Sequence, residues 1–232
     1  METILPKYPH TPHLPYKVGE GAGWTCSTKE CQSIFETELY TYVEEKVDGA
    51  NCAMMLYNGE PVIRNREHIL RKGYAKKGTS AKVQFRPAWN WFYDNKKKFQ
   101  ALNKIVGNPT AVYGEWLWAL HGVVYKNLPS YFMPYDIYVH GNFIDPHKAK
   151  ILLRQAGFDA VPILAIGAIP NWTYLENLCN EQSVFGPEQR EGVYLKQSDG
   201  QVTTKRFKMV RSGYIQGLKW SSKKITKQKT KK

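Results

Sequence analysis

A lysine at the end of a strand-like run is the residue in this sequence best suited to nucleophilic chemistry. Lys46 ends the run YTYVEEK, is followed by Val47-Asp48-Gly49, and precedes a second strand-like run. A lysine beside other cations loses its proton more readily and can then act as a nucleophile. The Lys-Val-Asp-Gly pattern is weak alone, because it also occurs in hairpin turns. The alternative for Lys46 is therefore an exposed turn residue.

Further charged and aromatic motifs follow Lys46 in a fixed order, and the order is more informative than any one of them. They are Arg64-Asn65-Arg66, Tyr113-Gly114-Glu115-Trp116, the run YFMPYDIY that contains Tyr135, Glu191-Gly192-Val193-Tyr194-Leu195-Lys196, and Lys205-Arg206-Phe207-Lys208.

This ordered series resembles the motifs of the covalent nucleotidyltransferases, the superfamily of ATP-dependent ligases and RNA-capping enzymes. Within it, the chain is most similar to the RNA ligase family. The opening KYPHTPHLP and the later RSGYIQG are also similar to that group, so the resemblance covers most of residues 6–220. It implies an α+β nucleotidyltransferase fold, an ATP-grasp-like ligase adenylation domain whose mostly antiparallel sheets are flanked by helices.

The resemblance implies that Lys46 attacks the α-phosphorus of ATP and forms a lysyl–AMP intermediate. A free lysine has a pKa of about 10.4. Lys208 and Arg206 are the cations expected to lower the pKa of Lys46 and to neutralise the phosphate. The last motif is usually lysine, any residue, lysine, so Arg206 departs from the family pattern. Lys205 could replace it only by a register shift that changes the strand face.

The remaining motifs imply a nucleotide pocket and a metal site. Arg64 or Arg66 would contact the ribose or the RNA terminal phosphate, and the sequence leaves open which arginine faces the site. Glu115 would bind the ribose hydroxyls, and Tyr135 would stack on the adenine. Glu191 would hold Mg²⁺ or Mn²⁺. The residues around the nucleophile, Glu45, Asp48 and Asn51, are expected to line the same pocket. The alternatives are surface strand positions for the arginines and glutamates, a core position for Tyr135, and an ordinary turn for Asp48 and Asn51.

The expected reaction joins RNA ends that carry a 5′-phosphate and a 3′-OH, by way of an adenylylated 5′ end. Two alternatives stay open: a DNA ligase of the same superfamily, and an inactive ligase-like RNA-binding protein. The sequence does not distinguish a nick, a tRNA break or single-stranded ends. A monomer is expected.

Composition favours a basic cytoplasmic protein that acts on a polyanion. The 232 residues carry a net charge of +13, and removing the seven lysines of residues 219–232 leaves +6. Such an excess suits phosphate contacts. No apolar run is long enough to span a membrane, and no signal pattern is present. The four cysteines lack zinc-ligand spacing and are expected to be reduced thiols.

The periodicity predicts one domain over residues 1–220 and a basic, disordered tail over residues 221–232. Residues 1–23 are expected to form an extended arm. The Asp48-Gly49 and Asn58-Gly59 pairs are predicted to join the first three strands as turns. The predicted strands cover residues 40–46, 51–57, 61–66, 110–118, 131–139, 160–166, 191–197 and 201–208, and the predicted helices cover 87–106, 146–156 and 171–181.

Overall fold

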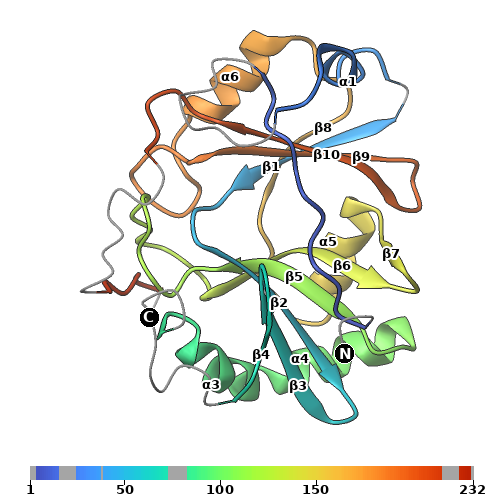
Figure 1. The fold of residues 1–232 in the computed structure, drawn as a ribbon, viewed down its shortest axis with the longest axis vertical. Coiled ribbons are helices and arrows are strands. Elements are labelled where there is room, and N and C mark those ends of the chain that lie inside the picture. Colours follow the sequence, from blue (N-terminus) through green and yellow to red (C-terminus); the bar gives the residue numbers. More distant parts are fainter. Residues whose placement is uncertain (1–3, 16–24, 38, 73–82, 216–224, 231–232) are drawn as a thin grey trace.

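Two antiparallel sheets, one above the other, form the centre of the protein (Figure 1). The structure is a computed structural model and describes residues 4–15, 25–37, 39–72, 83–215 and 225–230. The first sheet has the order β10 (Thr203–Val210), β9 (Gly192–Ser198), β1 (Tyr40–Lys46) and β8 (Ile163–Ile166). The second has the order β4 (Ile69–Leu70), β3 (Glu60–Asn65), β2 (Ala50–Tyr57), β5 (Ala111–Trp116), β6 (Phe132–Val139) and β7 (Asn142–Phe143). These antiparallel ladders confirm the predicted α+β class.

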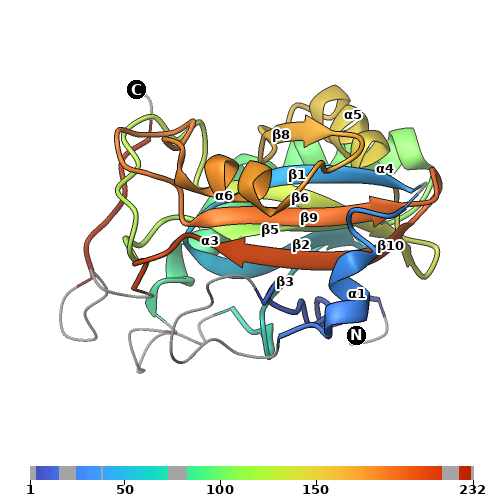
Figure 2. The same cartoon turned by 90° about the horizontal axis from the view of Figure 1, so that it is seen from above.

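Helices α6 (Trp172–Asn180) and the short α1 (Thr28–Gln32) cover the outer face of the first sheet and α3 (Arg86–Asp94) and α4 (Lys96–Val106) that of the second, while α5 (Pro146–Gln155) lies beside β6 (Figures 1 and 2). On the first sheet, Leu175 and Cys179 of α6 pack with apolar residues of β1, β9 and β10. Apolar residues of α3, α4 and α5 belong to the core of the second sheet. The opposite, inner faces of the sheets therefore face each other and carry the polar side chains described below.

The chain passes from one sheet to the other directly after Lys46. β1 belongs to the first sheet and pairs with β8 and β9, whereas β2 belongs to the second and pairs with β3 and β5. The prediction that Asp48-Gly49 forms a turn between paired strands is therefore wrong. The Asn58-Gly59 prediction is confirmed, since both residues have a positive φ in the two-residue loop between β2 and β3.

The helix predicted over residues 87–106 is two helices. Asn95 ends α3 and precedes α4 with φ −108° and ψ 11°, and its side chain donates to the carbonyl of Trp91. The break lets Phe92 and Phe99 stack with ring centroids 4.3 Å apart. Aromatic packing across the break therefore compensates for the lost helical continuity.

The N-terminal arm crosses both sheets (Figure 1). Among its described residues, Leu5 packs on the second sheet and Leu14 on the first, and both are fully buried. The amide of Leu14 donates to the carbonyl of Lys208, and the amide of Lys208 donates to the carbonyl of Pro12. The arm thus pairs alongside β10 through one short bridge. Residues 1–3 and 16–23 of the predicted arm lie outside the described residues.

Two expectations about the ends and the cysteines need correction. Cys26 and Cys31 form a disulfide across α1, whereas Cys52 and Cys179 are free and buried, so only the latter two are thiols as expected. In the predicted disordered tail, residues 225–230 pack on the body, and Gln228 is buried. The rest of the tail lies outside the described residues. Within the described part of the chain, no helix is long and apolar enough to cross a membrane.

Candidate active site

Lys46 forms an ion pair with Glu191 at the junction of the two sheets. Lys46 ends β1 opposite Gly192, so the residue just before β9 lies beside it. The Lys46 Nζ is 2.6 Å from the Glu191 Oε2, and their side chains are 22% and 6% exposed. The nucleophile predicted from the sequence and the carboxylate predicted to hold metal are therefore direct neighbours.

Close backbone approach brings Glu115 to the same place. A Cβ on Gly49 would lie 2.7 Å from the carbonyl oxygen of Trp116, so only glycine allows the link after Lys46 to pass this close to β5. Glu115 lies opposite Asn51 in the β2–β5 ladder, and its carboxylate accepts a hydrogen bond from the backbone of Gly49. The site thus holds two acids and one amine in a small volume.

The electrostatics of this group differ from the expectation. Burial acts to lower the pKa of Lys46, but the carboxylates of Glu191, Glu115 and Asp48 outweigh it and raise that pKa. The expected lowering of the Lys46 pKa by Lys208 and Arg206 is therefore wrong as a net effect: the amines of Lys46 and Lys208 repel each other, but the carboxylates dominate. The ion pair keeps the amine protonated.

The two glutamates have raised pKa values for the matching reason. Burial raises the pKa of Glu115 to about 8, with a further increase from Glu191 and Asp48 that Lys46 partly offsets. Burial likewise raises the pKa of Glu191 to about 7, and Lys46 is again the main opposing charge. Carboxylates that are desolvated and close to one another favour a bound cation.

Lys208 supplies a second amine from β10. It lies opposite Tyr194, and burial together with the charges of Lys46 and Arg66 lowers its pKa to about 8. No carboxylate of the described residues lies within ion-pair distance of Lys208. An amine of this kind is available to bind phosphate.

The arm contributes His13, which the sequence analysis did not single out. His13 bridges to Lys208 through its backbone, and burial plus the charges of Lys208 and Lys46 lowers its pKa to about 4. The imidazole is therefore neutral at pH 7. The KYPHTPHLP motif was the available signal, since it contains His13 and resembles the family.

Arg206 lies in a separate, buried network. Its Nε donates to the Tyr8 hydroxyl at 3.1 Å and lies 3.8 Å from the Asp136 carboxylate. Asp136 also pairs at 2.7 Å with Lys196, which is fully buried and pairs at 2.7 Å with Glu44. The structure therefore places Arg206 among structural ion pairs between the sheets. Spacing alone did not reveal this network, because its members come from five segments, the arm, β1, β6, β9 and β10.

The two candidate arginines have opposite environments. Arg64 is 1% exposed, and its guanidinium donates to the carbonyls of Leu5, Asn65 and Glu67, so it holds the arm in place. The Arg66 side chain is 63% exposed, and its charge acts on Lys208. Arg66 is therefore the arginine left available to a ligand.

Tyr135 lies between the sheets beside Asn51. The Asn51 amide donates to the Tyr135 hydroxyl at 2.5 Å. The rings of Tyr135 and Tyr194 are nearly parallel, with centroids 6.5 Å apart and an interplanar angle of 15°, and Tyr8 packs edge-on against Tyr135. Both predicted pocket residues thus lie on the inner face, next to aromatic residues from the arm and β9.

Glu45 and Asp48 contact loops and lie apart from any open surface. Glu45 points away from Lys46, as alternation along a strand requires, and accepts from the Ser183 hydroxyl and the Val184 amide. The Asp48 carboxylate accepts from the amides of Gly122 and Val123. Both acids are buried, and their partners show that they shape the loops that surround the site.

The donor chemistry fits a divalent cation. The structure places no three His, Cys, Asp or Glu side chains together as a complete metal site within its described residues. Glu191 and Glu115 offer hard oxygen ligands at the site. Mg²⁺ is commonly held by one or two carboxylates together with substrate phosphates, so a complete protein cage is not required.

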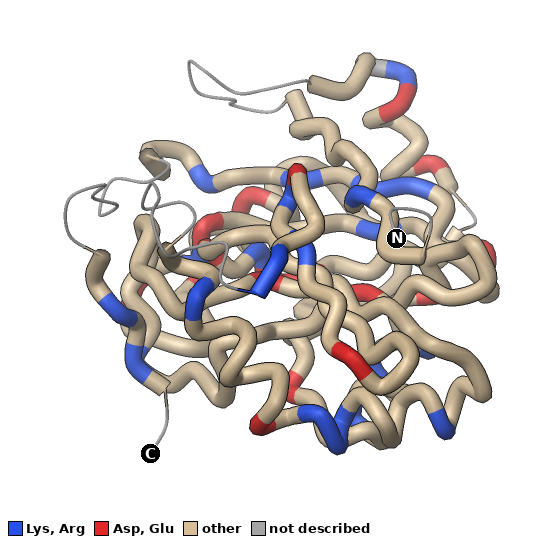
Figure 3. The backbone as a smooth tube through the Cα atoms, turned by 60° about the horizontal axis from the view of Figure 1, so that its bottom comes forward, with Lys and Arg blue, Asp and Glu red and all other residues tan. Residues whose placement is uncertain are grey.

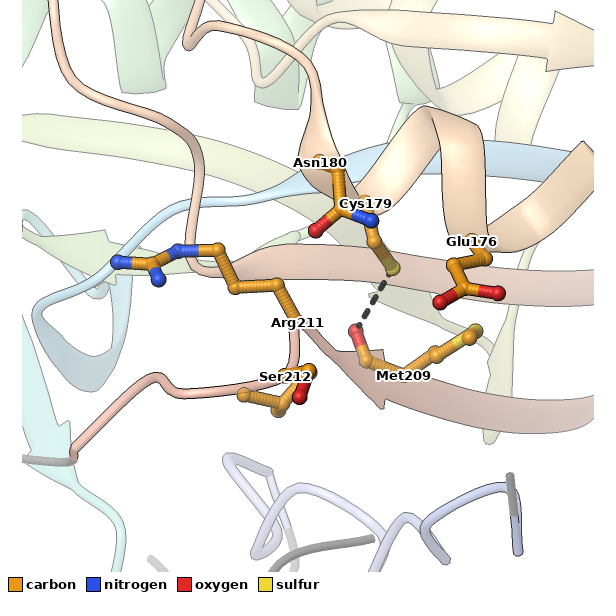
Figure 4. Close-up of a pocket in the computed structure, with 7 residues that line it drawn as sticks. Glu176, Cys179, Asn180, Met209, Arg211 and Ser212 are labelled. Atoms are coloured by element: carbon orange, nitrogen blue, oxygen red, sulfur yellow. Dashed lines mark hydrogen bonds between the residues drawn. The ribbon is translucent and has the colours of Figure 1, made fainter. Parts of the chain in front are cut away.

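A small pocket on the other face of the first sheet is separate from this site (Figure 4). It lies between α6 and the end of β10, and its volume of about 10 Å³ holds at most one water. Burial raises the pKa of the Cys179 thiol to about 12, and that thiol donates to the carbonyl of Met209. This thiol is therefore not a nucleophile at neutral pH.

The sequence model of the RNA ligase family matches residues 39–210, from β1 to β10. The match covers both sheets and every motif from Lys46 to Lys208. The chain belongs to the RNA ligase family. No curated protein sequence gives a significant match.

Solved structures support the same fold. An RNA ligase of Naegleria gruberi, in a mutant apo form, is similar with a TM-score of 0.57 at 18% identity, over 79% of this chain and 52% of that one. An archaeal ATP-dependent RNA ligase is similar with a TM-score of 0.54 at 16% identity, over 88% of this chain and 48% of that one. The chain thus spans about half the length of these ligases. Other structures of the Naegleria ligase contain pyrophosphate, or ATP and Mn.

Proposed function

We propose that this protein is an ATP-dependent RNA ligase whose nucleophile is Lys46. The ion pair between Lys46 and Glu191, 2.6 Å long and mostly covered, is the observation that carries the proposal. An exposed turn lysine would have no reason to lie among buried carboxylates. Family membership and the ATP, Mn and pyrophosphate bound to the Naegleria ligase support the same reading.

In the proposed first step, the Lys46 Nζ releases a proton to solvent, its lone pair attacks the α-phosphorus of ATP, and a second proton leaves the nitrogen as the phosphoramidate forms. The bond from that phosphorus to the bridging oxygen breaks, and pyrophosphate leaves. Glu191, with Glu115 nearby, would hold Mg²⁺ or Mn²⁺, which would offset phosphate charge and the carboxylate charge that keeps Lys46 protonated. Lys208 and the exposed Arg66 would bind phosphate oxygens.

Contacts to the nucleoside follow from the inner faces of the sheets. We place the adenine near Tyr135 and Tyr194, and the ribose near Glu115, in the ATP-grasp-like arrangement expected of a ligase adenylation domain. Asn51 would orient Tyr135 through its hydrogen bond. Arg206 acts indirectly, because its contacts to Tyr8 and Asp136 support the aromatic side of the proposed nucleoside site. The proposed substrate is RNA with 5′-phosphate and 3′-OH ends, bound in part by the basic residues spread over the chain (Figure 3).

Incubation with α-labelled ATP and magnesium tests the proposal. Wild-type protein, first treated with pyrophosphate to remove bound AMP, should become labelled, and Lys46→Ala should not. Nicked RNA and nicked DNA duplexes then test the substrate. Absence of label in the wild type would refute the nucleotidyltransferase, and sealing of DNA alone would favour a DNA ligase.

A further inference from the structure

Residues 225–230, which we name the C-terminal strap, pair with the segment that follows β5. The amide of Leu120 donates to the carbonyl of Thr226 at 2.7 Å, and the amide of Gln228 donates to the carbonyl of Trp118 at 2.9 Å. Isolated bridges join Ala119 to Lys227 and Leu128 to Thr230. The strap is thus held by backbone hydrogen bonds along its length.

Gln228 is the side chain through which the strap reaches the interior. It is 4% exposed. Its Nε2 donates to the carbonyl of Val123 at 2.7 Å, and its Oε1 accepts from the amide of Tyr125 at 3.2 Å. One amide group therefore satisfies a buried acceptor and a buried donor two residues apart. Both backbone groups lie outside the strands, and among the described residues Gln228 is their hydrogen-bond partner, so the glutamine satisfies groups that no ladder satisfies.

The segment that Gln228 holds is the one that grips Asp48, two residues after the nucleophile. The Asp48 Oδ2 accepts from the amides of Gly122 at 2.5 Å and Val123 at 2.8 Å, and the Asp48 amide donates to the Tyr125 hydroxyl at 2.7 Å. A Cβ on Gly122 would lie 3.0 Å from that same carboxylate oxygen, so glycine permits the contact. Val123 and Tyr125 each bond to Gln228 on one side and to Asp48 on the other.

We infer that Gln228 is a positioning residue for the link between β1 and β2 that directly follows Lys46. The path runs from the strap through Val123 and Tyr125 to Asp48, which fixes the link between the sheets where Lys46 stands. This inference rests on the proposed function only for the role of Lys46. The hydrogen-bonded path itself does not depend on it. Small displacements of a reacting group reduce reaction rates strongly.

The test uses the full chain with three substitutions. Gln228→Met keeps the length and volume of the side chain and removes both hydrogen bonds. Gln228→Glu keeps the acceptor for the Tyr125 amide and, when ionised, lacks the donor for Val123. Lys229→Gln is the control, because Lys229 is exposed in the same strap. Amide hydrogen exchange is measured at Gly122 and Val123, with Leu195 and Phe207 in the first sheet as internal references.

We expect the Gly122 and Val123 amides of Gln228→Met to exchange roughly tenfold faster than in wild type, since local opening becomes easier. Gln228→Glu should lie between, and Lys229→Gln should match wild type. The references should not change. Adenylylation of Lys46 at saturating ATP should fall about tenfold in Gln228→Met, with little change in the ATP concentration for half-saturation.

Two results would overturn the inference. Unchanged exchange at Gly122 and Val123 in Gln228→Met would show that the strap does not hold the segment that contacts Asp48. Faster exchange with an unchanged adenylylation rate would show that the segment that contacts Asp48 does not position Lys46. If wild-type protein takes no label, the proposed function fails, while the exchange data still decide whether the strap holds Asp48's partners. Gln228→Glu serves if Gln228→Met does not fold.

Discussion

The Lys46 amine lies 2.6 Å from the Glu191 carboxylate, so the proposed nucleophile rests in an ion pair. Cations near a lysine would lower its pKa, but here the nearest charges are acids, and they raise it. Of the two amines at this site, Lys208 is the one with a lowered pKa, about 8. For Lys46 to act as the proposed nucleophile, the charge of Glu191 would have to be offset when substrates bind.

Replacing Glu191 by glutamine should lower the pKa of Lys46. The substitution removes the strongest charge that raises this pKa and leaves the burial that lowers it. The expected result is a shift of about one unit or more in the pH at which Lys46 reacts with an amine reagent, followed by mass spectrometry. Glu67→Gln, at an exposed acid, is the control. An unchanged titration of Lys46 in Glu191→Gln would contradict the ion pair.

Replacing Glu115 by glutamine should stabilise the ligand-free protein at pH 8 while it abolishes activity. The pKa of Glu115 is raised from 4.5 to about 8, so the folded protein holds this proton after the unfolded chain has lost it. The free energy of unfolding therefore falls as the pH rises from about 4.5 to 8. Glutamine removes this loss, with an expected gain of about 1–2 kcal/mol at pH 8 in urea unfolding. Equal pH sensitivity of the variant and wild type would refute this.

Alanine at Arg64 and at Arg66 should have opposite effects. Arg64→Ala removes a buried guanidinium that holds the carbonyls of Leu5 and Glu67, and it should cost about 2–4 kcal/mol of stability. Arg66→Ala should change stability by less than about 0.5 kcal/mol, because this side chain is exposed. The rate at which the Arg66→Ala variant seals RNA should instead fall. Thermal unfolding and a ligation assay separate the two, and a destabilised Arg66→Ala would contradict the assignment.

A matching contrast is expected on β10. Arg206→Ala leaves the buried Asp136 with fewer partners and should lower the free energy of unfolding by about 2–4 kcal/mol. Lys208→Ala removes an amine with no ion-pair partner among the described residues, so the fold should persist. Its rate of adenylylation should fall about tenfold or more. Denaturant unfolding and α-labelled ATP give both readouts, and a fully active Lys208→Ala would exclude Lys208 from the site.

Local patterns predicted much of the sheet architecture. Alternation and turn residues located the strands around Lys46, Glu115 and Lys208 to within two residues. What local patterns could not predict was pairing. The Asp48-Gly49 pair has the composition of a hairpin turn. In the structure, Gly49 instead packs closely against Trp116 and Leu117, and the chain continues into the other sheet.

Only part of the candidate site could be predicted, because contacts between distant segments are not visible in local patterns. Ordered motifs identified Lys46, Glu115, Glu191 and Lys208, which the fold brings together. Whether an arginine is buried or free depends on distant segments, so Arg64 could not be told from Arg66 without the arm. The burial of Gln228 likewise depends on contacts with residues 118–125, and a lysine-rich composition gave no sign of it.

The pairing of the arm with β10 also sets the order in which the protein can be assembled. Pro12 and Leu14 are made before the family-matched region, but their backbone partner, Lys208, is among the last residues of that region to be made. Such long-range contacts form slowly. The arm therefore stays unpaired while the strands between it and Lys208 are made, and the inner faces that hold Tyr8 and His13 are completed only after Lys208 has been made.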